Sequence, residues 1–247
     1  MYNQPIKNST DIFSKYKYIV FFDCEATQFS QELIRIGAVK CVVKDNGILE
    51  TTEEFQSFVQ PIKETSLSKF IISYTGITDA KLKQLAIPFE DCLELFFDFV
   101  GDMKNTLFVA YGNFDKQILL NSIDLVELET DKLFQRYFLD NILDFSMFLY
   151  KYVRTPQNNS LSLVNAVKEL GGLPLAGSHN PLIDAKNLQL LFILFLNKKE
   201  LISKRWLQAI VCVSKDMPEC LKLFLNELAD GEMPDMNSLI EHISLEI

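Results

Sequence analysis

The sequence predicts an α/β fold: a mixed sheet of three antiparallel strands followed by parallel strands, with flanking helices and a C-terminal helical extension. Three observations indicate this. Apolar segments rich in β-branched and aromatic residues come first, helical spacing replaces them from Ser66, and later short apolar runs alternate with helical patterns. With 48% apolar residues, including 20 Phe, the chain can bury one large core.

Three strands are predicted in the N-terminal part of the chain. An apolar run over 18–22 leads directly into two acids and is typical of a strand buried on both faces. A second strand is expected over 33–43, and a third over 51–60 before Pro61. Because 45–47 reads Asp-Asn-Gly, a hairpin signal, these strands should form an antiparallel meander.

Helices are predicted from apolar spacing and from capping residues. Leu67, Phe70, Ile71 and Tyr74 recur at helical spacing, and Gly76 supplies a C-terminal stop. Further elements are expected as follows: helices beginning at Thr78, Pro88, Asn113, Leu161 and Asn180, a strand over 106–111, a strand turning into a helix within 138–150, and two or three amphipathic helices after Lys199.

Charge and composition narrow the function classes. The formal net charge of −9 argues against a broad phosphate-binding surface, although metal ions at an acidic site would reverse the local sign. Five scattered cysteines and only two histidines make a structural zinc site improbable and suggest a reduced, cytoplasmic protein. We expect no membrane association, since neither a signal peptide nor a spanning apolar run is visible.

Asp23 and Glu25 stand where the first strand ends. Side chains at i and i+2 of a strand point the same way, so the two carboxylates should lie side by side. Desolvated acids are costly, and their mutual repulsion calls for a cation. The alternative is a strand that ends at the surface with two solvated acids.

Two later segments repeat this placement of an acid where an apolar strand meets a helix. Asp115 falls in the first turn of the helix after Tyr111, where the helix dipole alone also favours an acid. His179 directly precedes the Asn180-Pro181 helix start, with Asp184 one turn later, so both could face a common point. The alternative for the histidine is a solvated loop residue.

This ordered set of residues resembles the DEDDh 3′–5′ exonucleases of the RNase H-like fold. The pattern consists of Asp-x-Glu on the first strand, an Asp after a later strand, and His-x-x-x-x-Asp at a helix start. The segments 23–27 and 75–78 are most similar to the branch that trims histone mRNA ends and small RNAs. The resemblance implies an exonuclease domain over 16–198, after a flexible lead-in of 1–15 and before a helical extension of 199–247.

The resemblance also implies the roles of the five residues. Asp23, Glu25 and Asp184 would hold one Mg²⁺ or Mn²⁺, Asp23 would bridge to a second ion that Asp115 helps to retain, and His179 would be the general base. Oxygen ligands suit these hard cations. Two such ions would activate water and stabilise the leaving 3′-oxygen.

Substrate contacts are implied in the same way. The Ala26 backbone and the Thr27 hydroxyl would meet the sugar of the terminal nucleotide, and Ile77 would contact its base. Phe29 would stack on a base, although a buried ring plugging the strand end is an alternative. The other apolar residues of the helix–turn over 67–78 are expected to be core.

The predicted function is therefore metal-dependent 3′–5′ exonucleolytic hydrolysis of single-stranded ends, RNA rather than DNA, releasing nucleoside 5′-monophosphates. Alternatives are a DNA-directed proofreading or repair exonuclease and a non-catalytic protein-interaction module on the same fold. Cys24 departs from the large apolar residue common between the two acids, and without a preceding basic RNA-binding domain, long structured RNA is a less natural target.

The C-terminal extension has no counterpart in the resemblance. Its apolar residues Leu221, Phe224, Leu225 and Leu228 follow helical spacing and define one apolar helix face. We expect this face to pack on the domain, with a protein partner as the alternative.

Overall fold

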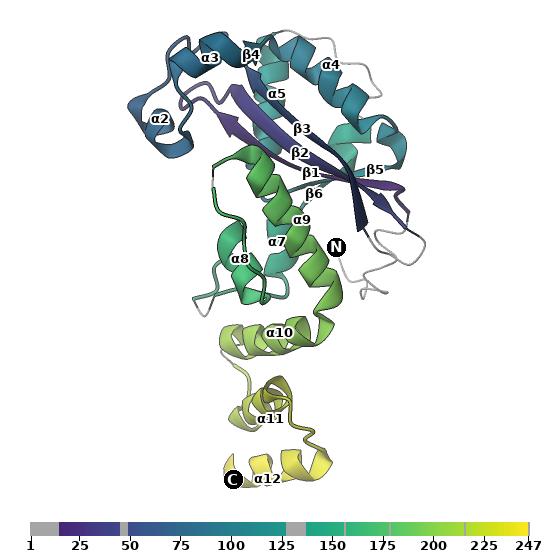
Figure 1. Cartoon of the computed structure of the whole chain (residues 1–247). Helices are drawn as coiled ribbons and strands as arrows, with labels where there is room; N and C mark the ends of the chain where they lie inside the picture. Colours follow the sequence, from purple (N-terminus) through teal and green to yellow (C-terminus); the bar gives the residue numbers. More distant parts are fainter. Residues whose placement is uncertain are drawn as a thin grey trace.

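A six-stranded mixed sheet lies at the centre of the chain, in the order β4-β3-β2-β1-β5-β6 (Figure 1). Its strands are β1 (Tyr18–Ala26), β2 (Leu33–Val43), β3 (Leu49–Val59), β4 (Ala86–Ile87), β5 (Thr106–Ala110) and β6 (Ile142–Asp144). The first three strands pair antiparallel, whereas β1–β5, β5–β6 and β3–β4 pair parallel. The predicted mixed sheet is confirmed. The two-residue β4 was missed, because so short a strand leaves no alternation to detect.

The computed structural model describes residues 15–44, 49–126, 137–155, 157–177, 179–214 and 216–246. Apart from Lys15, the predicted lead-in lies outside the described residues, as does the predicted hairpin turn over 45–47.

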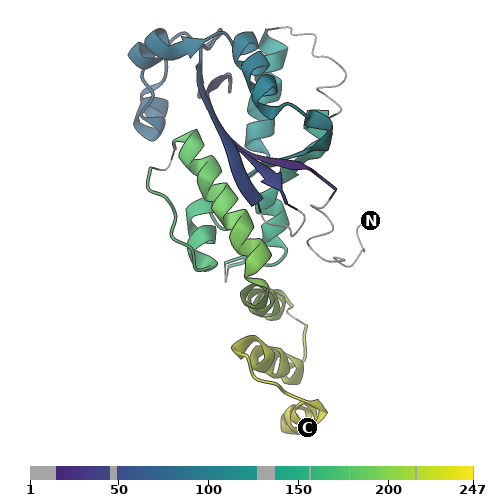
Figure 2. The same cartoon turned by 45° about the vertical axis from the view of Figure 1, so that its right-hand side comes forward.

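Helices cover both faces of the sheet (Figures 1 and 2). The helices are α2 (Lys69–Thr75), α3 (Asp79–Leu85), α4 (Phe89–Val100), α5 (Phe114–Leu125), α7 (Phe145–Tyr150), α8 (Leu163–Glu169), α9 (Pro181–Asn197), α10 (Lys199–Val213), α11 (Glu219–Asp230) and α12 (Met236–Glu246), with short 3₁₀ turns η1 (Met103–Asn105) and η2 (Leu139–Asn141). Helices α4 and α5 lie on one face and α7, α8 and α9 on the other, while α2 and α3 flank the sheet beside β3 and β4.

The alternation of side chains along β1 divides the core into two layers. Val20 and Phe22 pack toward α4 and α5, where Phe138 contacts the Phe22 ring at a centroid distance of 5.9 Å. Phe21 points to the opposite face and meets Phe192 of α9 edge-on at 5.3 Å. A strand buried on both faces therefore anchors both layers, as its continuous apolar run predicts.

The three C-terminal helices form a column that leads away from the sheet (Figures 1 and 2). Helix α10 packs against α9, α11 against α10, and α12 against α11. The predicted apolar face of α11 is only partly covered, since Leu221 remains exposed. The division into 16–198 and 199–247 stays a prediction. Within the described part of the chain, every helix is too short or too polar to span a bilayer.

Gly37 determines how closely α9 approaches the sheet. It pairs with Asp23 across β1 and β2, and a Cβ atom at this position would overlap the backbone of Pro181 and Leu182. Only glycine leaves room for the start of α9 to rest on β2. This contact brings Asp184, in the first turn of α9, to the strand end that carries Asp23.

We expect Gly37→Ala to destabilise the protein by about 1–3 kcal/mol, the range for overpacking a dense core. Because the start of α9 must shift, activity that depends on Asp184 should also fall. Thermal denaturation and activity assays would check this, with Thr52→Ala on the exposed surface of β3 as the matched control. A Gly37→Ala protein as stable as that control would contradict the close-packing argument.

Candidate active site

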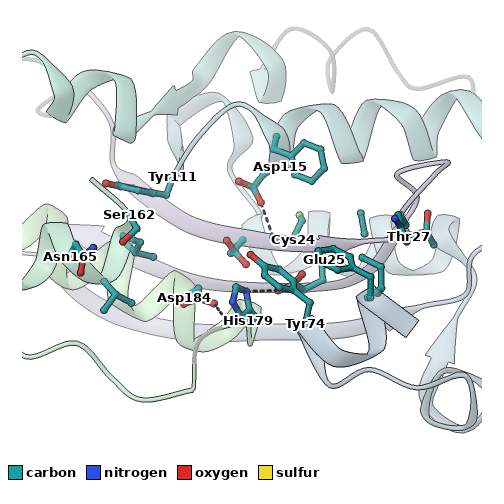
Figure 3. Close-up of a pocket in the computed structure, with 18 residues that line it drawn as sticks. Cys24, Glu25, Thr27, Tyr74, Tyr111, Asp115, Ser162, Asn165, His179 and Asp184 are labelled. Atoms are coloured by element: carbon teal, nitrogen blue, oxygen red, sulfur yellow. Dashed lines mark hydrogen bonds and ion pairs between the residues drawn. The ribbon is translucent and has the colours of Figure 1, made fainter. Parts of the chain in front are cut away.

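A pocket of about 790 Å³ opens where β1 and β5 end (Figure 3). The structure brings together along its wall all five residues expected from the sequence to do chemistry: Asp23, Glu25, Asp115, His179 and Asp184. They come from β1, the start of α5, and the loop and first turn at the start of α9. These elements are distant in sequence. The parallel pairing of β5 with β1 brings in Asp115, and the close contact of α9 with Gly37 of β2 brings in Asp184 and His179.

Asp115 is buried at the N-terminus of α5 and is tied to the opening strand. Its Oδ1 accepts a hydrogen bond from the Cys24 backbone N–H at 2.8 Å. Burial raises the pKa of Asp115 to about 7, although that hydrogen bond acts in the opposite direction. The bond ties the carboxylate to the β1 backbone at the residue between Asp23 and Glu25, a link that the sequence pattern did not reveal.

Asp184 organises the loop before α9. Its Oδ2 accepts a hydrogen bond from the backbone N–H of His179 at 2.8 Å (Figure 3). His179 has a positive φ of 64°, a left-handed conformation that is costly for a residue with a side chain. The strained backbone turns the ring toward Glu25, whose Oε1 lies 3.9 Å from the histidine Nδ1.

The four carboxylates oppose one another's ionisation. Burial, followed by the charges of Asp115, Asp184 and Glu25, raises the pKa of Asp23 well above its usual range. Burial and the charges of Asp184 and Asp115 raise the pKa of Glu25 to about 8. Burial also raises the pKa of Asp184, against its hydrogen bond from His179. A bound cation would relieve this repulsion at neutral pH.

The chemistry of these donors fits a hard divalent cation. Asp23, Glu25, Asp115 and Asp184 offer carboxylate oxygens, which suit Mg²⁺ or Mn²⁺. Among the residues that the structure describes, however, no three His, Cys, Asp or Glu side chains stand close enough to enclose an ion as they are. The carboxylates interact through their charges across an open site, and side-chain rotation would be needed to close it.

An aromatic wall that the sequence analysis missed borders His179. The Tyr74 ring centroid lies 3.7 Å from that of His179, and the Phe70 ring stacks on Tyr74 at 5.6 Å. Phe70 is 60% exposed and Tyr74 49%, so the expectation that they belong to the core is wrong. Ile71 carries the buried face of α2 instead. The i, i+4 spacing of the two aromatic residues was the available signal.

The opposite end of the pocket is more polar and was also missed. Figure 3 shows Tyr111, Ser162 and Asn165 together at this end, away from Thr27. The Tyr111 hydroxyl donates to the Leu161 carbonyl at 2.7 Å, and burial raises the pKa of Tyr111. No motif marked these residues. Tyr111 reaches the pocket because it directly follows β5, and Ser162 and Asn165 reach it through the packing of α8 on α9.

Only some of the residues expected to contact the substrate line the pocket. Ala26 and Thr27 line the pocket, but Thr27 is buried and its hydroxyl is engaged with Ser30 Oγ and the Glu32 backbone N–H. Phe29 is 78% exposed just outside the pocket, so the buried-plug alternative is wrong. Ile77 has no exposed surface, which corrects its expected contact with a base.

Ile77 is inaccessible because of the turn that precedes it. The chain reverses at Gly76, which caps α2 in the left-handed conformation with φ 69°. Ile77 then enters a small apolar cluster with Ile34, Leu67 and Leu82, between α2, α3 and the sheet. Ile77 therefore packs beneath α2 and helps to hold that helix in place, without reaching the pocket.

Two acids away from the pocket hold the loop that carries Phe29. Glu32 accepts hydrogen bonds from the backbone N–H groups of residues 62–64 and from the Ser30 hydroxyl. Glu64 accepts from the backbone N–H groups of Phe29 and Ser30. Although burial raises their pKa values, these hydrogen bonds lower the pKa of both carboxyls, which therefore stay ionised. The loop is thus held firmly beside the pocket.

Two of the curated relatives align with this chain over similar lengths, 204 and 196 residues. The chain is 24% identical over 204 residues to human ERI1 exoribonuclease 2, covering 71% of this chain and 28% of the relative. It is 26% identical over 196 residues to rat 3′-5′ exoribonuclease 1, covering 74% of this chain and 54% of the relative. The chain thus spans only part of the length of each.

Solved structures of nucleases are also similar to this chain. The nuclease domain of 3′hExo, described as a DEDDh family member bound to rAMP, has a TM-score of 0.62 and 25% identity, covering 74% of this chain and 94% of that one. Exonuclease I, at 14% identity and TM-score 0.59, covers 84% of this chain and 45% of that one and shows the fold alone. A family model described as Exonuclease (RNase_T) matches residues 20–192. Since this match covers more than half of the sequence, the chain belongs to the exonuclease family.

Proposed function

We propose that the chain is a metal-dependent 3′–5′ exonuclease that hydrolyses single-stranded ends, RNA in preference to DNA, and releases nucleoside 5′-monophosphates. The observation that carries the proposal is the convergence of four carboxylates and His179 in one pocket at the end of β1. The preference for RNA is supported by relatives named exoribonucleases and by a structural neighbour bound to rAMP.

The pocket suits one terminal nucleotide and its neighbour. Its volume of about 790 Å³ lies in the range of small-molecule sites, roughly 300–1,000 Å³. The exposed rings of Phe70 and Tyr74 offer stacking surfaces for a base, and Phe29 offers another just outside the pocket. With the Thr27 hydroxyl engaged, the Ala26 backbone is the better candidate for contacting the sugar.

The four carboxylates would hold two divalent cations in this proposal. Asp23, Glu25 and Asp184 would bind one ion, and Asp115 together with Asp23 the other. When bound, such ions supply an activated water and stabilise the leaving 3′-oxygen. The hydrogen bonds from Cys24 to Asp115 and from His179 to Asp184 orient two of the ligands in advance.

His179 is the general base of the proposal. Its Nδ1 faces Glu25, which leaves Nε2 as the ring nitrogen that accepts the proton of the attacking water. Packing against Tyr74 and the backbone bond to Asp184 hold the ring over the acids. A strained backbone maintained by two such contacts indicates a position that function requires.

The first test removes a single carboxylate. Asp23→Asn should abolish Mg²⁺-dependent shortening of a 5′-labelled single-stranded RNA while leaving the circular dichroism spectrum unchanged, because a neutral amide cannot bridge two cations. Asp98→Asn, on the exposed surface of α4, is the matched control and should retain full activity. Shortening by Asp23→Asn at the rate of that control would refute the metal-site assignment.

His179→Ala tests the base. Single-turnover hydrolysis should slow by about 10²–10⁴-fold, the usual contribution of general-base catalysis. Calorimetry should show little change in Mn²⁺ affinity, since the imidazole is not a proposed ligand. The base role is excluded if the variant turns over as fast as the unaltered enzyme, and a lost Mn²⁺ affinity would make the histidine a ligand instead.

The raised pKa values predict how stability depends on pH without metal. The pKa of Glu25 is about 8 and that of Asp115 about 7 in the folded chain, both far above the range of an unfolded carboxyl. Between pH ~4 and ~8 the folded state therefore retains protons that the unfolded state has released, and stability should fall as pH rises. Bound Mg²⁺ should offset this loss, so it should raise the melting temperature more at pH 8 than at pH 5.

Thermal denaturation in chelator and in Mg²⁺ measures this dependence. Glu25→Gln removes one of the carboxyls whose pKa is raised, so the melting temperature in chelator should depend less on pH. Glu53→Gln, on the surface of β3, should leave that pH dependence unchanged. Equal Mg²⁺ shifts at both pH values would contradict the charge cluster as the cation site.

A further inference from the structure

Arg35 is a buried cation on β2, the strand beside the one that carries Asp23 and Glu25. In the antiparallel pairing of β1 with β2 it stands opposite Glu25, just as Gly37 stands opposite Asp23. Paired residues share a face of the sheet, so Arg35 and Glu25 project to the same side. Arg35 is only 8% exposed and does not line the pocket.

The surroundings of Arg35 hold its guanidinium without neutralising it. Its Nη2 donates to Gln56 Oε1 at 3.2 Å, and the guanidinium carbon lies 4.7 Å from the centre of the Phe58 ring. Its buried Nε has no hydrogen-bond partner among the described residues. An amide and an aromatic ring orient a guanidinium but carry no negative charge. Buried arginine normally requires an acid.

The carboxylate that interacts with this charge is Glu25. The Arg35 charge lowers the pKa of Glu25, which burial and the neighbouring acids raise. In return, burial lowers the pKa of Arg35 and the charge of Glu25 raises it. Within the described chain Arg35 makes no direct ion pair, so the two charges interact through space and not through a shared contact.

We propose that Arg35 is a fixed positive charge on the strand beside Glu25 that weakens the binding of divalent cations to the acid cluster. The inference rests on the proposed function, because it takes the cluster as the cation site. The attraction between Arg35 and the Glu25 carboxylate is present with and without a bound cation. The guanidinium keeps its charge, so the term that appears on binding is its repulsion of the divalent cation. The net effect on cation affinity is therefore unfavourable.

This arrangement has a consequence for substrate binding. Four carboxylates and two divalent cations sum to zero charge, so Arg35 leaves the loaded site with one positive charge in excess. A phosphodiester carries one negative charge. Arg35 thus weakens the binding of cations alone and favours a loaded site that also contains the substrate phosphate.

Calorimetric titration of the full chain with Mn²⁺ tests the proposal. Arg35→Met, of similar length and without charge, should bind Mn²⁺ roughly threefold to tenfold more tightly than the unaltered chain, the scale of one charge acting through a partly solvated interior. Arg35→Lys keeps the charge and should bind as the unaltered chain does. Arg35→Gln gives a second neutral variant should Arg35→Met fail to fold.

Lys81→Met is the matched control. Lys81 lies over the same Phe58 ring, 5.1 Å from its centre, but on α3 and not opposite Glu25. The Lys81→Met variant should bind Mn²⁺ with the same affinity as the unaltered chain. Neutral Arg35 variants that bind Mn²⁺ no more tightly than the unaltered chain overturn the inference, even if they are less stable. No Mn²⁺ binding by the unaltered chain overturns the proposed cation site as well.

Discussion

The burial of Asp23 and Glu25 beside other acids at the end of β1 is the constraint on which the structure of the site depends. Their carboxylates share one face of β1, and two further acids are brought against them by α5 and α9. Burial, together with the charges of the neighbouring acids, raises the pKa of both carboxyls, and this rise is a cost to the metal-free fold. Such a cost is expected where function requires the charges to be together.

The rest of the fold serves to hold these acids in place. Gly37 lets α9 rest on β2, the Cys24 backbone binds Asp115, and Asp184 holds the strained backbone of His179. Phe70 and Tyr74 wall the pocket on one side and remain exposed because Ile71 supplies the apolar anchor of α2. The chain presents an acidic pocket with an aromatic wall on one side, which suits a nucleotide brought in with cations.

Much of this was predictable from local pattern. The strands and helices were predicted from the periodicity of apolar residues and from helix-capping residues. The acids of the pocket were predicted from their positions where apolar strands end. Both kinds of signal lie within short segments of the sequence. Gly37, Arg35 and the exposure of Tyr74 were not predictable, because each depends on which element packs against it. Ile77 was misplaced for the same reason. The sequence of a helix and its following turn does not show which side chains face the pocket. Here Ile77 packs into the apolar cluster beside β3 and is buried.

The most direct test of the central claim is a side-by-side digestion of RNA and DNA oligonucleotides of the same sequence. The unaltered chain would be incubated with Mg²⁺, Mn²⁺ or chelator, and the products separated by length and identified by mass. The account predicts stepwise release of nucleoside 5′-monophosphates from the 3′ end, faster for RNA, with none in chelator and none when the 3′-hydroxyl is blocked. Cleavage that persists in chelator, or internal cuts in a blocked strand, would contradict it.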